Sequence, residues 1–135
     1  MDGSYGLIEV SGVVAAVDSL DAMCKAATVK LATWERKLGG RLVTVIVEGD
    51  VSDVTAAVEA ARNVCMQNGH ILASSGVIAA PCEETRKMVA LSAKRLQKNA
   101  AAERKTDSEG QHKVSAKRVQ RSSRKSEREH PGRQQ

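Results

Sequence analysis

The stretch RLVTVIVEGD, residues 41–50, constrains the fold of this chain more than any other. Its core, LVTVIV, is apolar at almost every position, so both faces of the strand it forms are expected to be covered. Such a strand lies inside a sheet. A charged turn with two adjacent glycines, ERKLGG, stands directly before it. The chain is therefore predicted to contain a hairpin with a glycine loop, whose second strand is central in a sheet.

The apolar periodicity around this hairpin predicts further strands and helices. Strands are expected at residues 5–10, 28–35, 42–47 and 70–80, and helices over 12–27, over 51–68 and from Pro81 onward. Asp50 is the expected N-cap of the second helix, and Asn68-Gly69 its end. The order β-α-β-β-α-β, followed by a helix, is the ferredoxin-like arrangement of the α+β class. It predicts a four-stranded antiparallel sheet with two helices on one face.

The formal charge of +5 is unevenly distributed. Residues 1–93 carry 8 Lys or Arg against 11 Asp or Glu, a net charge of −3, whereas residues 94–135 carry 13 against 5, a net of +8. Residues 104–135 have almost no apolar residue beyond Val114 and Val119, so this tail cannot bury enough surface to offset the entropy of ordering. We expect a folded domain over residues 1–97 and a disordered basic tail over 98–135.

No pattern in the sequence predicts an enzyme, a cofactor or a metal site. Cys24, Cys65 and Cys82 form no CxxC pair, and we expect reduced thiols that are buried or partly buried. The carboxylates occupy ordinary helix and turn positions, His70 begins a strand, and no P-loop, GxSxG or HExxH motif occurs. No apolar run is long enough for a membrane span and no leader is recognisable, so no membrane association is expected.

The ferredoxin-like arrangement by itself leaves the function open. RNA-recognition domains of this topology stack bases on aromatic residues of the central strands. This chain has no Phe, one Tyr and one Trp, so base stacking on the sheet is excluded.

Three segments resemble, in the right order, the pattern of bacterial microcompartment shell proteins. They are YGLIEVSGVVAAVDSLDAMCKAATV, LVTVIVEGDVSDVTAAVEAA and GHILASSGVIAAP. The likeness covers residues 5 to about 90, nearly the whole predicted domain. The chain is similar to the single-domain, hexamer-forming class of these subunits, which implies a place in a shell within the bacterial cytoplasm.

This resemblance implies a structural function. Subunits of the family form flat hexameric tiles, which pack side by side into a shell around a set of enzymes. The loop between the second and third strands converges on the six-fold axis and forms a narrow pore for metabolites. The family's loop, Lys-Ile-Gly-Ser-Gly, falls here without a gap on Lys37, Leu38, Gly39, Gly40 and Arg41.

The loop departs from the family pattern in two ways. Gly40 stands where Ser is common, which should widen the constriction, and Arg41 stands where Gly is usual. The chain also has one extra residue between Val29 and Lys37, which predicts a different loop shape. Six Arg41 side chains could line the pore and favour anions. Alternatively, Arg41 points to solvent or pairs with an acid such as Glu35, and both interpretations stay open.

The residues expected at the tile edge also differ from the family pattern. Lys25 matches the lysine that meets its symmetry mate between hexamers. Thr28 replaces a common Asn, Glu48 replaces an Arg, and Ala80 replaces the edge Arg, whose donor fork alanine cannot supply. We expect weaker self-tiling and a minor subunit that joins tiles made by other shell proteins.

The basic tail lies outside the resemblance. It is either a solubilising tail or a segment that recruits acidic enzymes or nucleic acid electrostatically. Two alternatives to the shell tile therefore remain: an adaptor that binds through its tail, and a regulatory domain that binds a small molecule between subunits.

Overall fold

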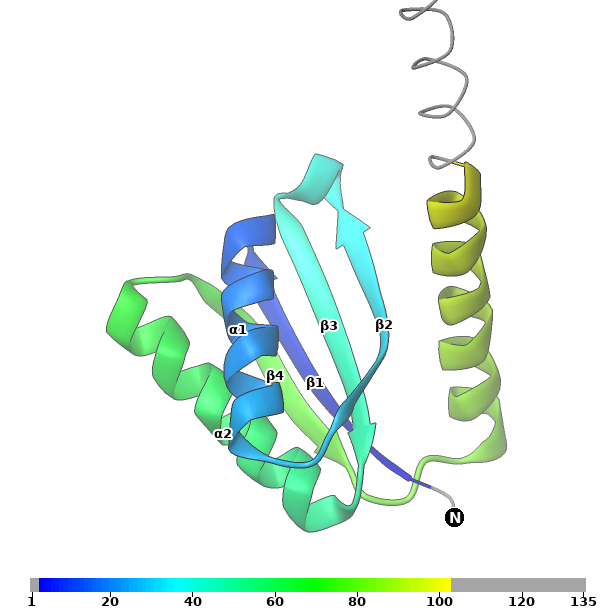
Figure 1. Cartoon of the computed structure of the whole chain (residues 1–135), viewed down its shortest axis with the longest axis horizontal. Coiled ribbons are helices and arrows are strands. Elements are labelled where there is room, and N and C mark those ends of the chain that lie inside the picture. Colours follow the sequence, from blue (N-terminus) through cyan, green and yellow to red (C-terminus); the bar gives the residue numbers. More distant parts are fainter. Residues whose placement is uncertain (1–2, 103–135) are drawn as a thin grey trace, which may run out of the picture. The chain divides into compact units, whose positions relative to one another are not determined.

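The computed structural model describes residues 3–102 (Figure 1). The chain divides into a compact unit, Met1–Leu96, and a second unit, Gln97–Gln135, of which residues 97–102 are described. The first unit contains the strands β1 (Ser4–Ser11), β2 (Lys30–Lys37), β3 (Leu42–Gly49) and β4 (Leu72–Ile78). They form an antiparallel sheet in the order β2-β3-β1-β4. This is the predicted ferredoxin-like α+β fold.

The main core lies between this sheet and two helices, α1 (Val13–Ala26) and α2 (Val51–Asn68), which cover the same face (Figure 1). Alternate residues of the central strands point toward the helices and are almost completely buried: Ile8, Val10, Val43, Val45 and Val47. Because β3 pairs with β2 on one side and β1 on the other, its predicted central position is confirmed.

The helices differ from the predictions in detail. On α1 the buried residues are Ala15, Ala16, Ser19 and Met23, and the predicted core residue Cys24 is exposed. Small side chains let α1 approach the sheet closely, and the Ser19 hydroxyl is satisfied by the Ala15 carbonyl at 2.7 Å. Asp50 does precede α2, but its side chain caps no backbone amide. The helix ends as predicted, with Gly69 in the left-handed region at φ 69°.

The predictions for the cysteines and for the start of the second strand were wrong in part. Cys65 is buried, but Cys82, like Cys24, is exposed, so the expectation of three buried or partly buried thiols was wrong for two of them. Strand β2 begins at Lys30, two residues later than predicted. The residues directly before β2 form a tight turn, in which the amide of Val29 donates to the carbonyl of Ala27 at 3.0 Å.

A third helix covers residues 83–102 and so runs past the predicted boundary at residue 97. Val89 on this helix packs with Tyr5 and Ile46 on the outer face of the sheet, away from α1 and α2. Ser92 lies there too, with its hydroxyl 2.8 Å from the hydroxyl of Thr33 and donating to the carboxylate of Glu35. The rest of the predicted disordered tail, residues 103–135, lies outside the described residues. Within residues 3–102, no helix is long and apolar enough to cross a bilayer.

Candidate functional site

The loop between β2 and β3 is the most unusual piece of backbone in the domain. It forms one short turn, Leu38–Gly40, at the end of the hairpin (Figure 1). Three consecutive residues have positive φ: Leu38 at 53°, Gly39 at 67° and Gly40 at 88°. Glycine adopts this region freely, whereas a leucine there is strained by about 1–2 kcal/mol. The two glycines are therefore explained by the geometry of the turn.

The loop is anchored to the start of α1. The amide of Gly12 donates to the carbonyl of Arg41 at 3.0 Å, and the amide of Arg41 lies 3.4 Å from the carbonyl of Leu38. A Cβ atom on Gly40 would meet a methyl group of Val13 at 3.4 Å. The hairpin and the first turn of α1 thus hold the loop in one conformation within a single subunit.

The side chains of this loop are turned outward. Lys37, Leu38 and Arg41 are all exposed, and Leu38 keeps 73% of its surface accessible. No ion pair between Arg41 and Glu35 occurs among the described residues, and Glu35 accepts the hydroxyl of Ser92. The loop therefore presents two cations and one apolar side chain at the end of the domain.

Strand β2 contains a bulge that bears on the shape of this loop. The pairing register shifts between Leu31 and Thr33, so Ala32 is an additional residue opposite β3. From Thr33 to Lys37 the pairing with β3 then runs without interruption. The bulge lies between Val29 and Lys37, so the additional residue Ala32 is accommodated in the strand before the loop begins.

The three residues predicted at the tile edge gather at the opposite end of the sheet. Register pairs Lys30 with Glu48 and Tyr5 with Ile78 at that end, whereas Lys37 pairs with Leu42 at the loop end. Lys25 and Thr28 lie just before β2, and Ala80 lies just after β4. At about 3.3 Å per residue, strands of this length separate the two ends by roughly 25 Å.

The edge residues have distinct surroundings. Lys25 is exposed and bonds to Asp21 one helical turn earlier, and this hydrogen bond raises the pKa of Lys25 above its usual value. Thr28 and Ala80 are exposed as well. The chain around Ala80 is fixed on both sides, because Ser4 donates to the carbonyl of Ala79 at 2.6 Å and Arg86 donates to that of Pro81 at 3.1 Å.

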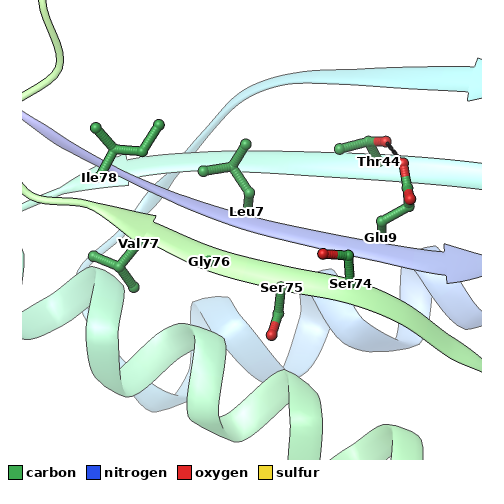
Figure 2. A pocket seen from close by; sticks show the side chains of 8 residues that line it. All are labelled: Leu7, Glu9, Thr44, Ser74, Ser75, Gly76, Val77 and Ile78. Atoms are coloured by element: carbon green, nitrogen blue, oxygen red, sulfur yellow. Dashed lines mark hydrogen bonds between the residues drawn. The ribbon is translucent and has the colours of Figure 1, made fainter.

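A groove lies on the outer face of the sheet (Figure 2). Leu7, Glu9, Thr44 and Ile78 project into it from β1, β3 and β4. Its one carboxylate, Glu9, accepts the hydroxyl of Thr44 at 2.8 Å. The residues lining the groove include no nucleophile paired with a base, and residues 3–102 contain no cluster of His, Cys, Asp and Glu suited to a metal ion. The groove offers no catalytic arrangement.

A polar cluster that the sequence did not predict joins α1 to the end of α2. The carboxylate of Asp18 accepts hydrogen bonds from Asn68 at 2.6 Å and from His70 at 2.8 Å. These bonds, with that of Asn68 the larger cause, lower the pKa of Asp18. The partners are about fifty residues apart in sequence, so only the tertiary fold reveals them. The cluster has a structural role, since it ties the two helices together beside the sheet.

Comparison with known proteins gives a consistent result. Residues 4–81 match the family model described as the BMC domain. The carboxysome shell protein CsoS1C of Hydrogenovibrio crunogenus is 42% identical over 88 residues, which cover 65% of this chain and 85% of that protein. CcmK1, a carboxysome shell protein of Thermosynechococcus vestitus, is 49% identical over 81 residues, covering 59% and 71% respectively.

Two further similarities cover only about half of the other protein. The microcompartment shell protein EutK of Escherichia coli is 42% identical over 89 residues, which span 66% of this chain and 52% of EutK. A microcompartment protein of Desulfitobacterium hafniense with a solved crystal structure superposes with a TM-score of 0.58 at 24% identity, covering 64% of this chain and 48% of that one. At that identity the superposition shows a shared fold alone.

Proposed function

The chain belongs to the BMC domain family and is a shell protein of a bacterial microcompartment, and we propose that six copies form a ring with the β2–β3 loops around a central pore. The members of this family are structural proteins and not enzymes, and they assemble with other shell proteins. The ring, its pore and the roles of individual residues are the proposed part.

The observation that carries the proposal is the separation of two surfaces on one rigid sheet. The loop Lys37–Arg41 lies at one end of the strands, and Lys25, Thr28 and Ala80 lie at the other. A flat ring needs one end of each subunit at its axis and the opposite end at its rim. The antiparallel register supplies that polarity without any rearrangement.

Exposed apolar side chains at the loop end support contact between copies there. Leu38, Val14 and Ile71 are 73%, 78% and 69% exposed. They share this end because Gly12 bonds to Arg41, and Ser11 donates to the carbonyl of Ile71 at 2.9 Å. Burying apolar surface contributes about 25 cal/mol per Å², so neighbouring subunits that covered these side chains would stabilise a ring.

We assign the pore to Lys37, Leu38, Gly39, Gly40 and Arg41. With glycine at position 40, the ring lacks side chains there, and the constriction is set by backbone and by the flanking residues. The exposed Lys37 and Arg41 would repeat six times around the axis. A ring of fixed cations attracts anions and excludes small cations, so we infer a pore for anionic or polar metabolites.

The rim residues point to a subunit that tiles weakly with itself. Lys25 is already bonded to Asp21, and a contact with a neighbouring hexamer would have to share or replace that bond. Ala80 offers no donor at a position whose flanking carbonyls are both fixed. We infer a minor shell component that joins tiles formed by other shell proteins of the same compartment.

A second function is proposed for the basic extension, with residues 1–97 as the shell domain and 98–135 as a separate segment that recruits a polyanion, either nucleic acid or an acidic cargo enzyme. The observation that favours it is the state of Lys98, the one cation of this extension that the structure describes. Lys98 is exposed and forms no ion pair with an acid among residues 3–102.

Light scattering on the purified full chain tests the ring. A particle of about 86 kDa, six times the 14.4 kDa subunit, is the expected result. Leu38→Asp is the matched variant, because it replaces an apolar side chain that a neighbouring copy is proposed to cover, and it should shift the mass toward the monomer. Leu91→Asp is the control, since Leu91 is exposed on helix 83–102 and should leave the mass unchanged. A monomer or dimer of the unaltered chain contradicts the ring.

A further inference from the structure

We propose that the open edge of β4 binds an extended segment of another protein by strand addition, with one lysine of that segment lying in the outer-face groove against Glu9. The partner is defined by this chemistry: a segment that forms a strand and carries a lysine on the face that meets the groove. The surface shares no residue with the β2–β3 loop or with the basic extension.

The two edge strands of the sheet differ in how they are protected against further pairing. β2 carries Lys30, Arg36 and Lys37 at exposed positions and contains the bulge at Ala32. Charged side chains and bulges both hinder the addition of another strand. β4 has the sequence LASSGVI, without a charged residue or a proline, and its pairing with β1 is regular over Ser74–Ile78. Within residues 3–102 it pairs with no other strand, so its far side presents backbone amides and carbonyls to a partner.

A missing side chain creates a hollow beside this edge. Ser74, Gly76 and Ile78 lie on the outer face of β4 (Figure 2). Gly76 stands opposite Leu7 of β1, and a Cβ atom at position 76 would meet no atom within 4 Å. The groove at this point has a volume of about 340 Å³. A strand added to β4 can therefore lay one side chain across Gly76 without meeting another side chain of β4.

The carboxylate of Glu9 gives the groove one negative charge. It accepts the hydroxyl of Thr44 at 2.8 Å and forms no ion pair with any residue of the described part of the chain. None of the described residues that line the groove is Lys or Arg. The groove is thus complementary to a cation. The two-pronged contact of an arginine would compete with Thr44 for the carboxylate, whereas the compact charge of a lysine needs only one oxygen.

The spacing of the strands suits this pair of side chains. Neighbouring strands lie about 4.8 Å apart, so a strand added to β4 would lie roughly 10 Å from β1, which carries Glu9. A lysine and a glutamate that point toward each other span this separation together. The aliphatic stem of the lysine would then pack on Leu7 and Ile78, of which Ile78 is 37% exposed.

A second hollow lies on the opposite face of the same edge. Its walls include Ser75 and Val77 of β4 and Val58 and Arg62 of α2, and its volume is about 330 Å³. Successive side chains of an added strand alternate between the two faces, so the neighbours of the lysine would enter this second hollow. The edge therefore combines the two features that strand addition uses, backbone partners along the strand and recesses for alternate side chains.

Fluorescence anisotropy with the full chain tests the inference. The probe is a short labelled peptide of alternating threonine and valine with one central lysine. It should bind saturably, and replacing the lysine by norleucine, which has the stem without the charge, should weaken binding about fivefold or more. N-methylation of the peptide amides should abolish binding, and free butylamine should compete only at a large excess, because each lacks the backbone donors. Equal binding of the norleucine or N-methylated peptide overturns the inference.

Matched variants of the chain locate the site. Glu9→Gln should weaken binding of the lysine peptide about fivefold or more and leave that of the norleucine peptide unchanged. Asp50→Asn removes the same charge from an exposed position outside the groove and should have no effect. Gly76→Val fills the hollow and should abolish binding, while urea denaturation shows an intact fold, because valine suits a strand.

Three results would contradict the site. They are unchanged binding to the Gly76→Val chain, an equal loss for Asp50→Asn and Glu9→Gln, and no binding of the lysine peptide to the assembled full chain. In the last case a neighbouring copy that covers β4 would be the partner of this edge, and a lysine-bearing segment of another protein would not.

Discussion

The amide of Gly12 donates a hydrogen bond to the carbonyl of Arg41 at 3.0 Å, and this bond connects the start of α1 with the loop of the β2–β3 hairpin. The two residues are far apart in sequence, yet the bond fixes the last residue of the loop against the first turn of a helix. Val13 packs beside Gly40 at the same place. The loop is therefore shaped by its own subunit, and a ring of such subunits would bring together six loops that are already formed.

Gly40→Ala should destabilise the domain. Gly40 has φ 88°, a region that costs an L-residue about 1–2 kcal/mol, while the new methyl group would only reach van der Waals contact with Val13 at 3.4 Å. Gly76→Ala is the control, because the backbone of Gly76 needs no positive φ and its Cβ position is open. Urea denaturation at one protein concentration should show a loss of about 1–2 kcal/mol for the first variant and little change for the second. Equal effects would contradict the assigned loop geometry.

Ser92→Ala should loosen the third helix from the sheet. The hydroxyl of Ser92 serves both Thr33, which is fully buried, and the carboxylate of Glu35. Its removal leaves these groups without their partner, at a cost of about 1–3 kcal/mol in free energy of unfolding. Ser74→Ala, at an exposed position on β4, should be nearly neutral. If both variants unfold at the same urea concentration, Ser92 does not hold the helix.

Acid should weaken the link between α1 and α2. Hydrogen bonds from Asn68 and His70 lower the pKa of Asp18 in the folded state, so its ionised form stabilises the fold above the unfolded pKa, about 3.9. This contribution is lost as the pH falls through the lowered folded pKa. Asp18→Asn should be less stable than the unaltered chain at neutral pH, and the difference should shrink below about pH 4. An NMR titration of Asp18 giving an unshifted or raised pKa would contradict the cluster.

The rim of the tile can be tested by restoring the donor that Ala80 lacks. Ala80→Arg should increase the tendency of concentrated protein to form sheets, because arginine supplies a planar fork of donors at an exposed position with a fixed backbone. Ala79→Arg, one residue earlier, is the control. Electron microscopy of both variants at equal concentration gives the readout. Sheets that are as extensive without the arginine as with it would contradict weak self-tiling.

Much of the fold follows from patterns that are local in the sequence. The apolar run of β3 predicted a central strand, and Asn68-Gly69 predicted the end of α2, because both depend on neighbouring residues alone. The expected burial of Cys24 was wrong because a thiol is apolar enough to fit a core, while the small buried side chain on this part of α1 is Ser19, whose hydroxyl is satisfied by a carbonyl of its own helix.

In the candidate site, too, some features were predictable from local sequence and others were not. Gly39 and Gly40 predicted a glycine loop in the hairpin, and both glycines adopt positive φ there. Two hydrogen bonds could not be predicted, that from Gly12 to Arg41 and that from Ser92 to Glu35. Each joins segments that are far apart in the sequence and meet only in the tertiary fold. The bulge at Ala32 likewise depends on pairing with β3, so it could not be placed from the residues of β2 alone.

Single-particle electron microscopy of the purified full chain tests the central proposal most directly, since it shows both the symmetry of the particle and the position of the β2–β3 loop. The account predicts a six-fold ring in which Lys37–Arg41 border a central opening and Lys25 and Ala80 lie at the rim. A ring with these loops on its outer edge, or a particle without six-fold symmetry, would contradict it.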